Sequence, residues 1–183
     1  MPIIPMSLKL YLAGPDVFRS EEGIATTFTQ LKQLAEQYGF IGCSPLDTNL
    51  DEISRNPHAV NEKRALGEAI FVGNDRLLQE CDVIIANLVP FRGACADDGT
   101  SWELGCGFAH GKRLYGYTPY AHTPFPERVK KYYPTAGETE FPEVEDFDGH
   151  ENLMLEYSIL HSGGILAPTF EDCLKHLRDN PPV

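Results

Sequence analysis

Short apolar runs and longer amphipathic segments alternate over the first two thirds of the chain. Four apolar runs have the length of strands, at residues 8–13, 40–43, 83–88 and 113–117. Between them, apolar side chains recur at helical spacing over 24–38, ahead of a Gly39 stop, and residues 60–79 are helical by composition. This alternation of strands and helices predicts a doubly wound, mostly parallel sheet with helices on both faces.

The pattern changes after the fourth strand. Residues 118–150 are rich in Pro, Gly, Tyr and acidic side chains. We interpret this segment as a long loop excursion that covers the functional site or contacts another subunit, and a partly disordered surface loop is the alternative. An apolar segment at 152–160, a short run at 163–166 and an amphipathic helix at 170–177 complete the chain.

The composition narrows the possible partners. Acidic residues outnumber basic ones 27 to 15, and the formal net charge is -12. Such a field repels nucleic acid and membrane surfaces, so neither is an expected partner. Five scattered cysteines, no secretory signal and no apolar run of ~20 residues predict a cytoplasmic protein. With 183 residues, we expect a single domain over 1–183.

The candidate chemistry is concentrated in residues 92–111, directly after the apolar run at 83–88. Asp97, Asp98 and Glu103 lie where a strand is followed by a small-residue helix, and open α/β sheets bind ligands beyond the carboxyl ends of their strands. Paired carboxylates in a cleft are typical of glycosidic bond chemistry. In the first turn of a helix, Glu103 is expected to be held ionised by the helix dipole, which suits a nucleophile.

Other polar residues lie near the same edge of the predicted sheet. Tyr11 ends the first strand and is placed to orient Glu103, unless its ring only fills the core. Asp47 follows the second strand in a polar loop at 44–57, whereas Asp75 reaches the crevice only from the end of its helix.

Glu103 also fits a purely structural role. The stretch Thr100-Ser101-Trp102-Glu103 has the spacing of a capping box, in which Glu103 bonds the backbone N–H of Thr100. The sequence alone leaves both readings open.

The sequence indicates neither a cofactor nor a metal. No G-x-G-x-x-G follows the first strand and no Walker lysine is present, so nicotinamide and ATP sites are not expected. The six histidines form no i, i+4 pair. Cys95 and Cys106 have no identifiable histidine base, which argues against a cysteine nucleophile.

Five short motifs, taken together, resemble the nucleoside 2-deoxyribosyltransferase family over residues 11 to about 155. The motifs are Tyr11-Leu12-Ala13-Gly14-Pro15, Pro45-Leu46-Asp47, Asn74-Asp75, Arg92-Gly93 with Asp97-x-Gly99-Thr100-x-x-Glu103-x-Gly105, and Asn152-Leu153-Met154-Leu155. The resemblance implies a flavodoxin-like α/β fold with a five-stranded sheet. It also implies transfer of 2-deoxyribose between nucleobases through a covalent deoxyribosyl-enzyme, without a cofactor.

The resemblance assigns four catalytic roles. Glu103 matches the family nucleophile, and Tyr11 matches the tyrosine that orients it. Asp75 matches the acid that protonates the leaving base and deprotonates the incoming one. Asp97, six residues before Glu103, matches an aspartate beside the sugar.

The resemblance also assigns substrate contacts and a quaternary structure. Gly14, Asp47 and Asp98 are expected to contact the deoxynucleoside or free base. Asn152, with Met154 near it, matches an asparagine that binds the sugar 5′-hydroxyl in a neighbouring subunit's site. This implies a homo-oligomer, either a hexamer or a smaller assembly of dimers.

The chain departs from the family pattern at three places, and two other functions stay open. Ala96 stands where many relatives have proline, the excursion at 118–150 is long, and the chain ends Pro181-Pro182-Val183 where the family often has a C-terminal aromatic residue. A related hydrolase of deoxynucleoside 5′-monophosphates is the first alternative. It needs cations near the first glycine turn, where Asp16 stands instead. A non-catalytic nucleotide-binding module is the second.

Overall fold

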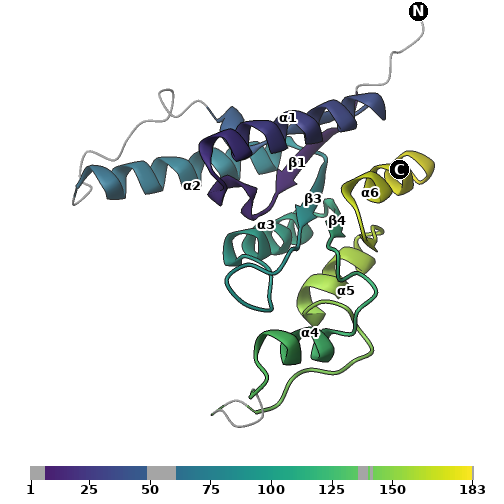
Figure 1. Cartoon of the computed structure of the whole chain (residues 1–183). Coiled ribbons are helices and arrows are strands. Elements are labelled where there is room, and N and C mark those ends of the chain that lie inside the picture. Colours follow the sequence, from purple (N-terminus) through teal and green to yellow (C-terminus); the bar gives the residue numbers. More distant parts are fainter. Residues whose placement is uncertain (1–6, 49–60, 136–139, 141, 183) are drawn as a thin grey trace, which may run out of the picture.

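The structure, a computed structural model, describes residues 7–48, 61–135, 140 and 142–182. Five parallel strands form one sheet in the order β2-β1-β3-β4-β5 (Figure 1). The strands are β1 (Lys9–Ala13), β2 (Ile41–Cys43), β3 (Val83–Asn87), β4 (Arg113–Tyr117) and β5 (Leu166–Ala167). Because this strand order is that of flavodoxin-like doubly wound sheets, the predicted fold class is confirmed.

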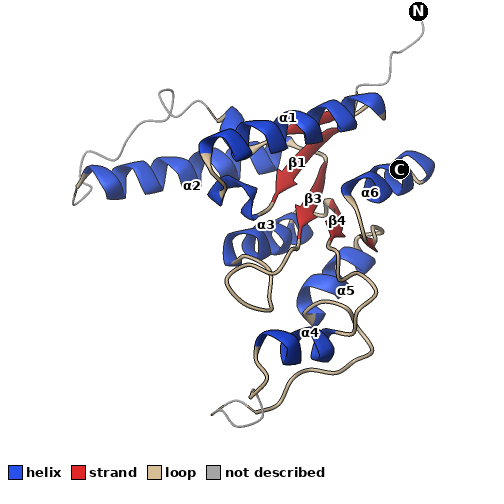
Figure 2. Cartoon of the chain, viewed as in Figure 1, coloured by secondary structure: helices blue, strands red, loops and turns tan. Residues whose placement is uncertain are grey.

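The described part of the chain contains six α-helices, of which α4 lies away from the sheet at one end of the molecule (Figure 2). They are α1 (Glu21–Gln37), α2 (Glu62–Glu80), α3 (Asp98–Ala109), α4 (Phe125–Tyr132), α5 (Leu153–His161) and α6 (Phe170–Asp179). Two short 3-10 helices, η1 (Pro15–Phe18) and η2 (Pro45–Asp47), follow β1 and β2. Within the described ranges, none of the helices is long and apolar enough to cross a bilayer.

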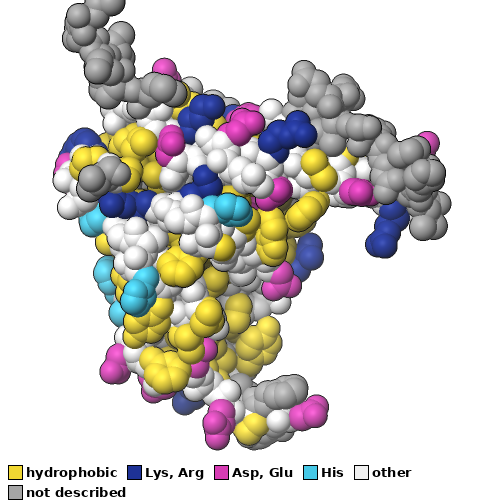
Figure 3. Space-filling model, turned by 180° about the vertical axis from the view of Figure 1, so that it is seen from behind, with side chains coloured by type: hydrophobic (Ala, Val, Ile, Leu, Met, Phe, Trp, Pro, Cys, Tyr) yellow, Lys and Arg dark blue, Asp and Glu magenta, His cyan; other side chains and the backbone are white. Residues whose placement is uncertain are grey.

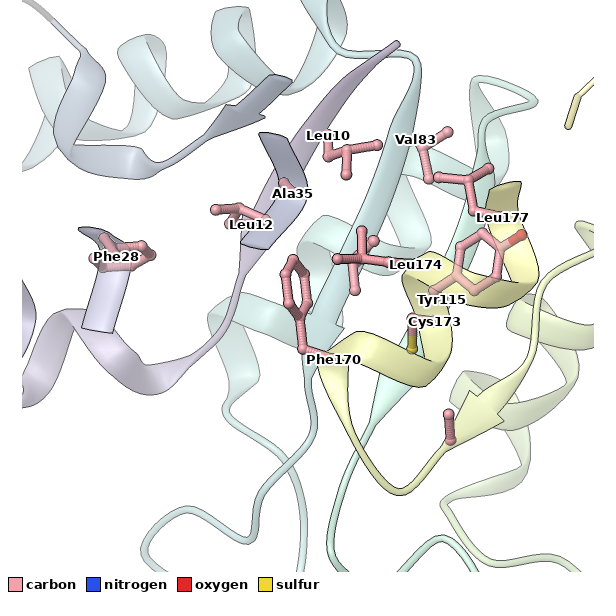
Figure 4. Packing of buried hydrophobic residues seen from close by; sticks show 12 residues of the cluster. Leu10, Leu12, Phe28, Ala35, Val83, Tyr115, Phe170, Cys173, Leu174 and Leu177 are labelled. Atoms are coloured by element: carbon pink, nitrogen blue, oxygen red, sulfur yellow. The ribbon is translucent and has the colours of Figure 1, made fainter. Parts of the chain in front are cut away.

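Alternation along the strands divides the core into two layers, because successive strand side chains point to opposite faces. On one face, Leu10, Leu12 and Val83 pack with residues of α1 and α6 (Figure 4). On the other face, Tyr11 and Ile84 pack with residues of α2, α3 and α5. Tyr11 therefore points toward the face that carries α3, the helix of Glu103.

Gly107 lets α3 approach the sheet closely. A Cβ at this position would lie 2.2 Å from Ile84 Cδ1 and 3.0 Å from Leu114 Cδ2, so a larger residue requires these side chains or the helix to shift. The last turns of α3 therefore pack closely against β3 and β4.

The segment at 118–150 was predicted to be a long loop, but it contains the helix α4. Pro126 lies in the first turn, where proline needs no hydrogen-bond partner. Arg128 of α4 forms a salt bridge with Glu151, and both side chains are fully buried. The salt bridge joins α4 to a residue 23 positions further along the chain. Glu127 in the first turn and Lys130 and Lys131 in the last turn are local helix signals, and the Pro- and Gly-rich composition of the whole segment concealed them.

Part of one predicted loop lies outside the described residues. The polar loop expected at 44–57 begins with η2, and its residues 49–57 are not described. The helix expected from about residue 60 is α2, whose described part starts with the cap Asn61.

Candidate active site

A cavity of about 490 Å³ opens at the carboxyl ends of β1 and β3. In this strand order the topological switch point lies between these two strands, which is where doubly wound sheets bind ligands. The turn after β1, the η2 loop, α2 and the first turns of α3 supply its lining, which includes Gly14, Phe18, Asn74, Asp97 and Glu103. No described residue of 118–150 lines it, so the described part of this segment does not cover the chain's own cavity.

Glu103, which lines this cavity, contacts the buried Tyr11, although 92 residues separate them in sequence. The Tyr11 hydroxyl donates a hydrogen bond of 2.6 Å to Glu103 Oε1. The phenol ring is fully buried, and β1 holds it rigidly in the sheet. The Glu103 carboxylate is therefore fixed by a group that cannot easily move away.

Asp97, rather than Thr100, caps α3. The Asp97 carboxylate accepts hydrogen bonds from the Thr100 backbone N–H at 3.0 Å and from the Thr100 hydroxyl at 3.2 Å. Glu103 consequently lies in the second turn of the helix and bonds Tyr11 rather than the Thr100 backbone. The capping-box reading of Glu103 is wrong.

The site holds Glu103 in an environment that favours its protonated form. Burial, together with the negative charge of Asp97, raises the pKa of Glu103 to about 7, and the Tyr11 hydrogen bond opposes this rise. The expectation that the helix dipole keeps Glu103 fully ionised is therefore wrong, because desolvation outweighs it. Burial and the Glu103 charge also raise the pKa of Tyr11, so its hydroxyl remains a donor.

A family model described as nucleoside 2-deoxyribosyltransferase matches residues 10–154. The chain belongs to the nucleoside 2-deoxyribosyltransferase family. The matched segment runs from β1 to the first turn of α5 and so contains Tyr11, the Asp97–Glu103 stretch and Asn152.

Comparison with individual proteins gives the same fold and similar lengths. An uncharacterized protein from Schizosaccharomyces pombe is 33% identical over 179 residues, covering 88% of this chain and 81% of the relative. The structure of a 2-desoxiribosyltransferase from Leishmania mexicana superposes with a TM-score of 0.69 at 26% identity, covering 96% of this chain and 99% of that one. A 2-deoxyribosyltransferase from Bacillus psychrosaccharolyticus shares the fold at 19% identity, with a TM-score of 0.53 and coverage of 90% and 88%.

Two aspartates assigned from the family resemblance do not line the cavity themselves. Asn74 lines it in the place expected for Asp75, whose carboxylate accepts a hydrogen bond of 2.8 Å from Gln79 Nε2. Asp75 is still near enough for its charge to contribute to the raised pKa of Tyr11. Asp47 forms a salt bridge with Lys32, and its neighbour Leu46 lines the cavity.

Asp98 faces a second, smaller cavity of about 330 Å³, next to the first. The two cavities share Asp97 as a wall. Gly14 lines the larger cavity with positive φ, and a Cβ there would lie 2.7 Å from Asn87 Cβ, so the turn after β1 requires glycine.

The two residues that the family resemblance assigns to a neighbouring subunit's site do not line this chain's own cavity. Asn152 caps α5, and its Oδ1 accepts a hydrogen bond of 3.1 Å from the Met154 backbone N–H. Met154 is 70% exposed. A position outside their own cavity is what a role in another subunit requires, and that role stays a prediction.

Several residues that give the cavity its shape could not be assigned from the sequence. Val17, Phe18 and Ile70 form apolar walls and carry no chemistry by which a motif would identify them, and Leu46, a further apolar wall, was quoted only as part of the motif Pro45-Leu46-Asp47. Asn74 was visible only as the neighbour of Asp75. Within the described residues, no cluster of three or more His, Cys, Asp or Glu side chains is placed to hold a metal ion.

Proposed function

We propose that this chain transfers 2-deoxyribose between nucleobases by double displacement, with Glu103 as the nucleophile. The observation that carries the proposal is the 2.6 Å hydrogen bond from the buried Tyr11 to Glu103 inside a cavity at the switch point. A glutamate with a pKa of about 7 is ionised in a substantial share of molecules at neutral pH.

In the first step, a Glu103 oxygen attacks C1′ of the deoxynucleoside and the bond from C1′ to the base nitrogen breaks. The base leaves with a proton from Asp75. In the second step, the nitrogen of an incoming base attacks C1′, displaces Glu103 and gives its proton to Asp75. Two inversions return the original configuration at C1′. To take this role, Asp75 must break its hydrogen bond with Gln79 and turn toward the cavity. Its neighbour Asn74 already lines the cavity.

Asp97 is proposed to lie beside the sugar. Its carboxylate caps α3 and lines both cavities, so one residue fixes the helix that carries Glu103 and faces the substrate. We assign Gly14, Asp47 and Asp98 to the surrounding contacts on the family resemblance, with 1–183 acting as one domain. No cofactor takes part in this scheme.

We also propose that the active form is a homo-oligomer, in which Asn152 and Met154 of one subunit complete the cavity of the next. Large apolar side chains of α5 are exposed, with Met154 at 70%, Tyr157 at 47% and Leu160 at 45%. Figure 3 shows hydrophobic side chains gathered on the back of the molecule. A surface of this kind favours burial against another subunit.

The hydrolase alternative is not favoured. It needs free cations near the turn after β1 to hold a 5′-phosphate. There, Arg19 donates to the buried Asp16 at 2.7 Å, and Asn87 donates to the same carboxylate at 2.8 Å. The Arg19 charge is therefore already paired, and the guanidinium of Arg92, which also lies near this turn, is placed over the Phe91 and Phe18 rings.

Incubation with a deoxynucleoside and a second free base tests the proposal. Exchange supports a transferase, free deoxyribose or its phosphate supports a hydrolase, and no turnover supports a binding module. A 2-fluoro-2-deoxynucleoside, whose fluorine slows breakdown of the glycosyl-enzyme, should label the Glu103 peptide in mass spectrometry. The label should be absent in Glu103→Gln and present in Glu22→Gln, a matched change on the exposed surface of α1. A label on Asp97 or Asp98 would show that we have chosen the wrong carboxylate.

A further inference from the structure

Side-chain carboxylates bond four successive backbone N–H groups where the chain enters α5. Glu156 Oε2 accepts hydrogen bonds from the His150 N–H at 2.7 Å and from the Glu151 N–H at 3.0 Å. Glu151 Oε1 accepts from the Asn152 N–H at 2.9 Å, and Glu145 Oε1 accepts from the N–H that follows, at 2.8 Å. The backbone is therefore fixed on both sides of Asn152.

The carboxylate that holds the Asn152 backbone is itself held by a buried cation from α4. Arg128 Nη2 donates to the same oxygen, Glu151 Oε1, and both side chains are fully buried. The guanidinium carbon lies 4.9 Å from the Phe125 ring centroid and 5.9 Å from the Tyr120 ring centroid. One oxygen atom of Glu151 thus joins α4 to the start of α5, which lies next to it at the same end of the molecule (Figure 1).

Stability alone does not account for this ion pair. Arg128 Nε, Arg128 Nη1 and Glu151 Oε2 are buried and have no hydrogen-bond partner among the described residues. The cost of desolvating two charges often exceeds their attraction, and apolar residues of similar volume are commonly as stable or more so. The acceptor that the pair supplies to the Asn152 N–H is a contact that an apolar pair cannot make.

The fixed backbone leaves Asn152 with one free group. Its Oδ1 accepts a hydrogen bond of 3.1 Å from the Met154 N–H. Within the described part of the chain its Nδ2 group has no partner, and the residue is half-buried. A donor whose backbone is already ordered binds a hydroxyl without the entropic cost of ordering it.

We propose that Glu151 is a positioning residue for Asn152, and that Arg128 fixes Glu151 for this role. The free amide of Asn152 then donates to the 5′-hydroxyl of a deoxynucleoside bound in the neighbouring subunit's cavity. This inference rests on the proposed function, since it assumes that Asn152 reaches a substrate there. Helix α4, which lies away from the sheet, thereby supports sugar binding in a cavity that belongs to another subunit.

Two double variants separate the role of Glu151 from the stability of the ion pair. Arg128→Met/Glu151→Leu replaces both charges with apolar side chains and should unfold at the temperature of the wild type or higher. Because the Asn152 N–H loses its acceptor, the KM for a deoxynucleoside should rise about ten-fold with kcat little changed, the scale of one lost hydrogen bond. Arg128→Met/Glu151→Gln keeps a side-chain oxygen for that N–H, and its KM should return to within about three-fold of the wild type.

A 2′,5′-dideoxynucleoside, which lacks the 5′-hydroxyl, shows whether the loss passes through Asn152. The wild type and both double variants should have the same KM for this substrate, because the contact is absent in all of them. An equal rise of KM for both substrates would mean general damage to the site and would overturn the inference. An unchanged KM for the deoxynucleoside in Arg128→Met/Glu151→Leu would overturn it too. Arg178→Met/Asp179→Leu, a comparable change in an exposed pair on α6, should leave both KM values unaltered.

Arg128→Lys takes the place of Arg128→Met/Glu151→Leu if that protein does not fold. It keeps a cation beside Glu151 but loses the planar fork of donors. It should raise the KM for the deoxynucleoside about three-fold and leave that for the 5′-deoxy substrate unchanged. A ratio of the two KM values equal to that of the wild type would contradict the positioning role.

Calorimetric titration of a deoxynucleoside and its 5′-deoxy analogue separates this inference from the proposed function. If the wild type exchanges no bases but prefers the 5′-hydroxyl, and Arg128→Met/Glu151→Leu loses that preference, the transferase proposal fails and the positioning role stands. If exchange proceeds and the double variant keeps the preference, only the positioning role fails. A wild type that binds both compounds equally overturns the positioning role in either case.

Discussion

Replacing Glu103 with glutamine is expected to stabilise the fold at alkaline pH while it abolishes transfer. The wild-type carboxyl has its pKa raised from 4.5 to about 7, chiefly because folding buries it. Between these two values the folded protein holds a proton that the unfolded chain has lost. The stability contributed by Glu103 is therefore fully present below pH 4.5 and is lost as pH rises through 7.

The size of this effect follows from the interval between the two values. At about 1.4 kcal/mol per pH unit, an interval from 4.5 to about 7 corresponds to at most about 3 kcal/mol at pH 8. Glutamine carries no charge at any pH in this range, and its side-chain oxygen still accepts a hydrogen bond from Tyr11. The variant avoids the cost of burying a carboxylate and keeps the contact with Tyr11.

Urea unfolding at pH 4.5 and at pH 8 measures the difference. We expect the free energy of unfolding of Glu103→Gln to match that of the wild type at pH 4.5 and to exceed it by up to about 3 kcal/mol at pH 8. Glu22→Gln, which changes an exposed carboxylate, should show no such difference. A variant less stable than the wild type at pH 8, or a difference equal at both pH values, would refute the buried-carboxylate account.

Two further predictions concern the pH profile and the assembly. In Tyr11→Phe, the loss of the hydrogen bond that lowers the pKa of Glu103 should move the acid limb of the exchange rate to higher pH, by about one to two pH units for a bond to a charged group. Initial rates between pH 5 and 9 measure this, and an unchanged limb would show that Glu103 does not control it. Asn152→Ala should raise KM for the deoxynucleoside and leave the fold intact, because the substrate loses a contact from the neighbouring subunit. Sedimentation of the wild type should find no active monomer. A fully active monomer would contradict the role in a neighbouring subunit.

The fold class could be predicted from the sequence, because a parallel sheet that is buried on both faces has strands made of continuous apolar runs. All five residues of β3 are buried, as expected of the continuous apolar run at residues 83–88. The order of strands and helices then allows few topologies. The sequence also predicted that the acidic stretch after β3 belongs to the functional site, because doubly wound sheets bind ligands at this edge.

The contacts that each acid makes depend on the tertiary structure. Asp97 and Glu103 both lie near the start of α3. The spacing between Thr100 and Glu103 is that of a capping box, so the sequence allowed Glu103 to be a helix cap. In the structure, the hydroxyl of Tyr11, 92 residues away in sequence, donates a hydrogen bond to Glu103, and the Asp97 carboxylate caps the helix. The pKa of Glu103 depends on burial by the whole fold, which local charge patterns do not contain.

The same reason explains why the apolar wall formed by Phe18 could not be predicted. The Phe18 ring stacks on Phe91, which lies in another loop. Hydrophobic periodicity reports which residues an element buries, but not which distant element covers them. The packing of parallel strands brings these loops together, and that packing exists only in the folded chain.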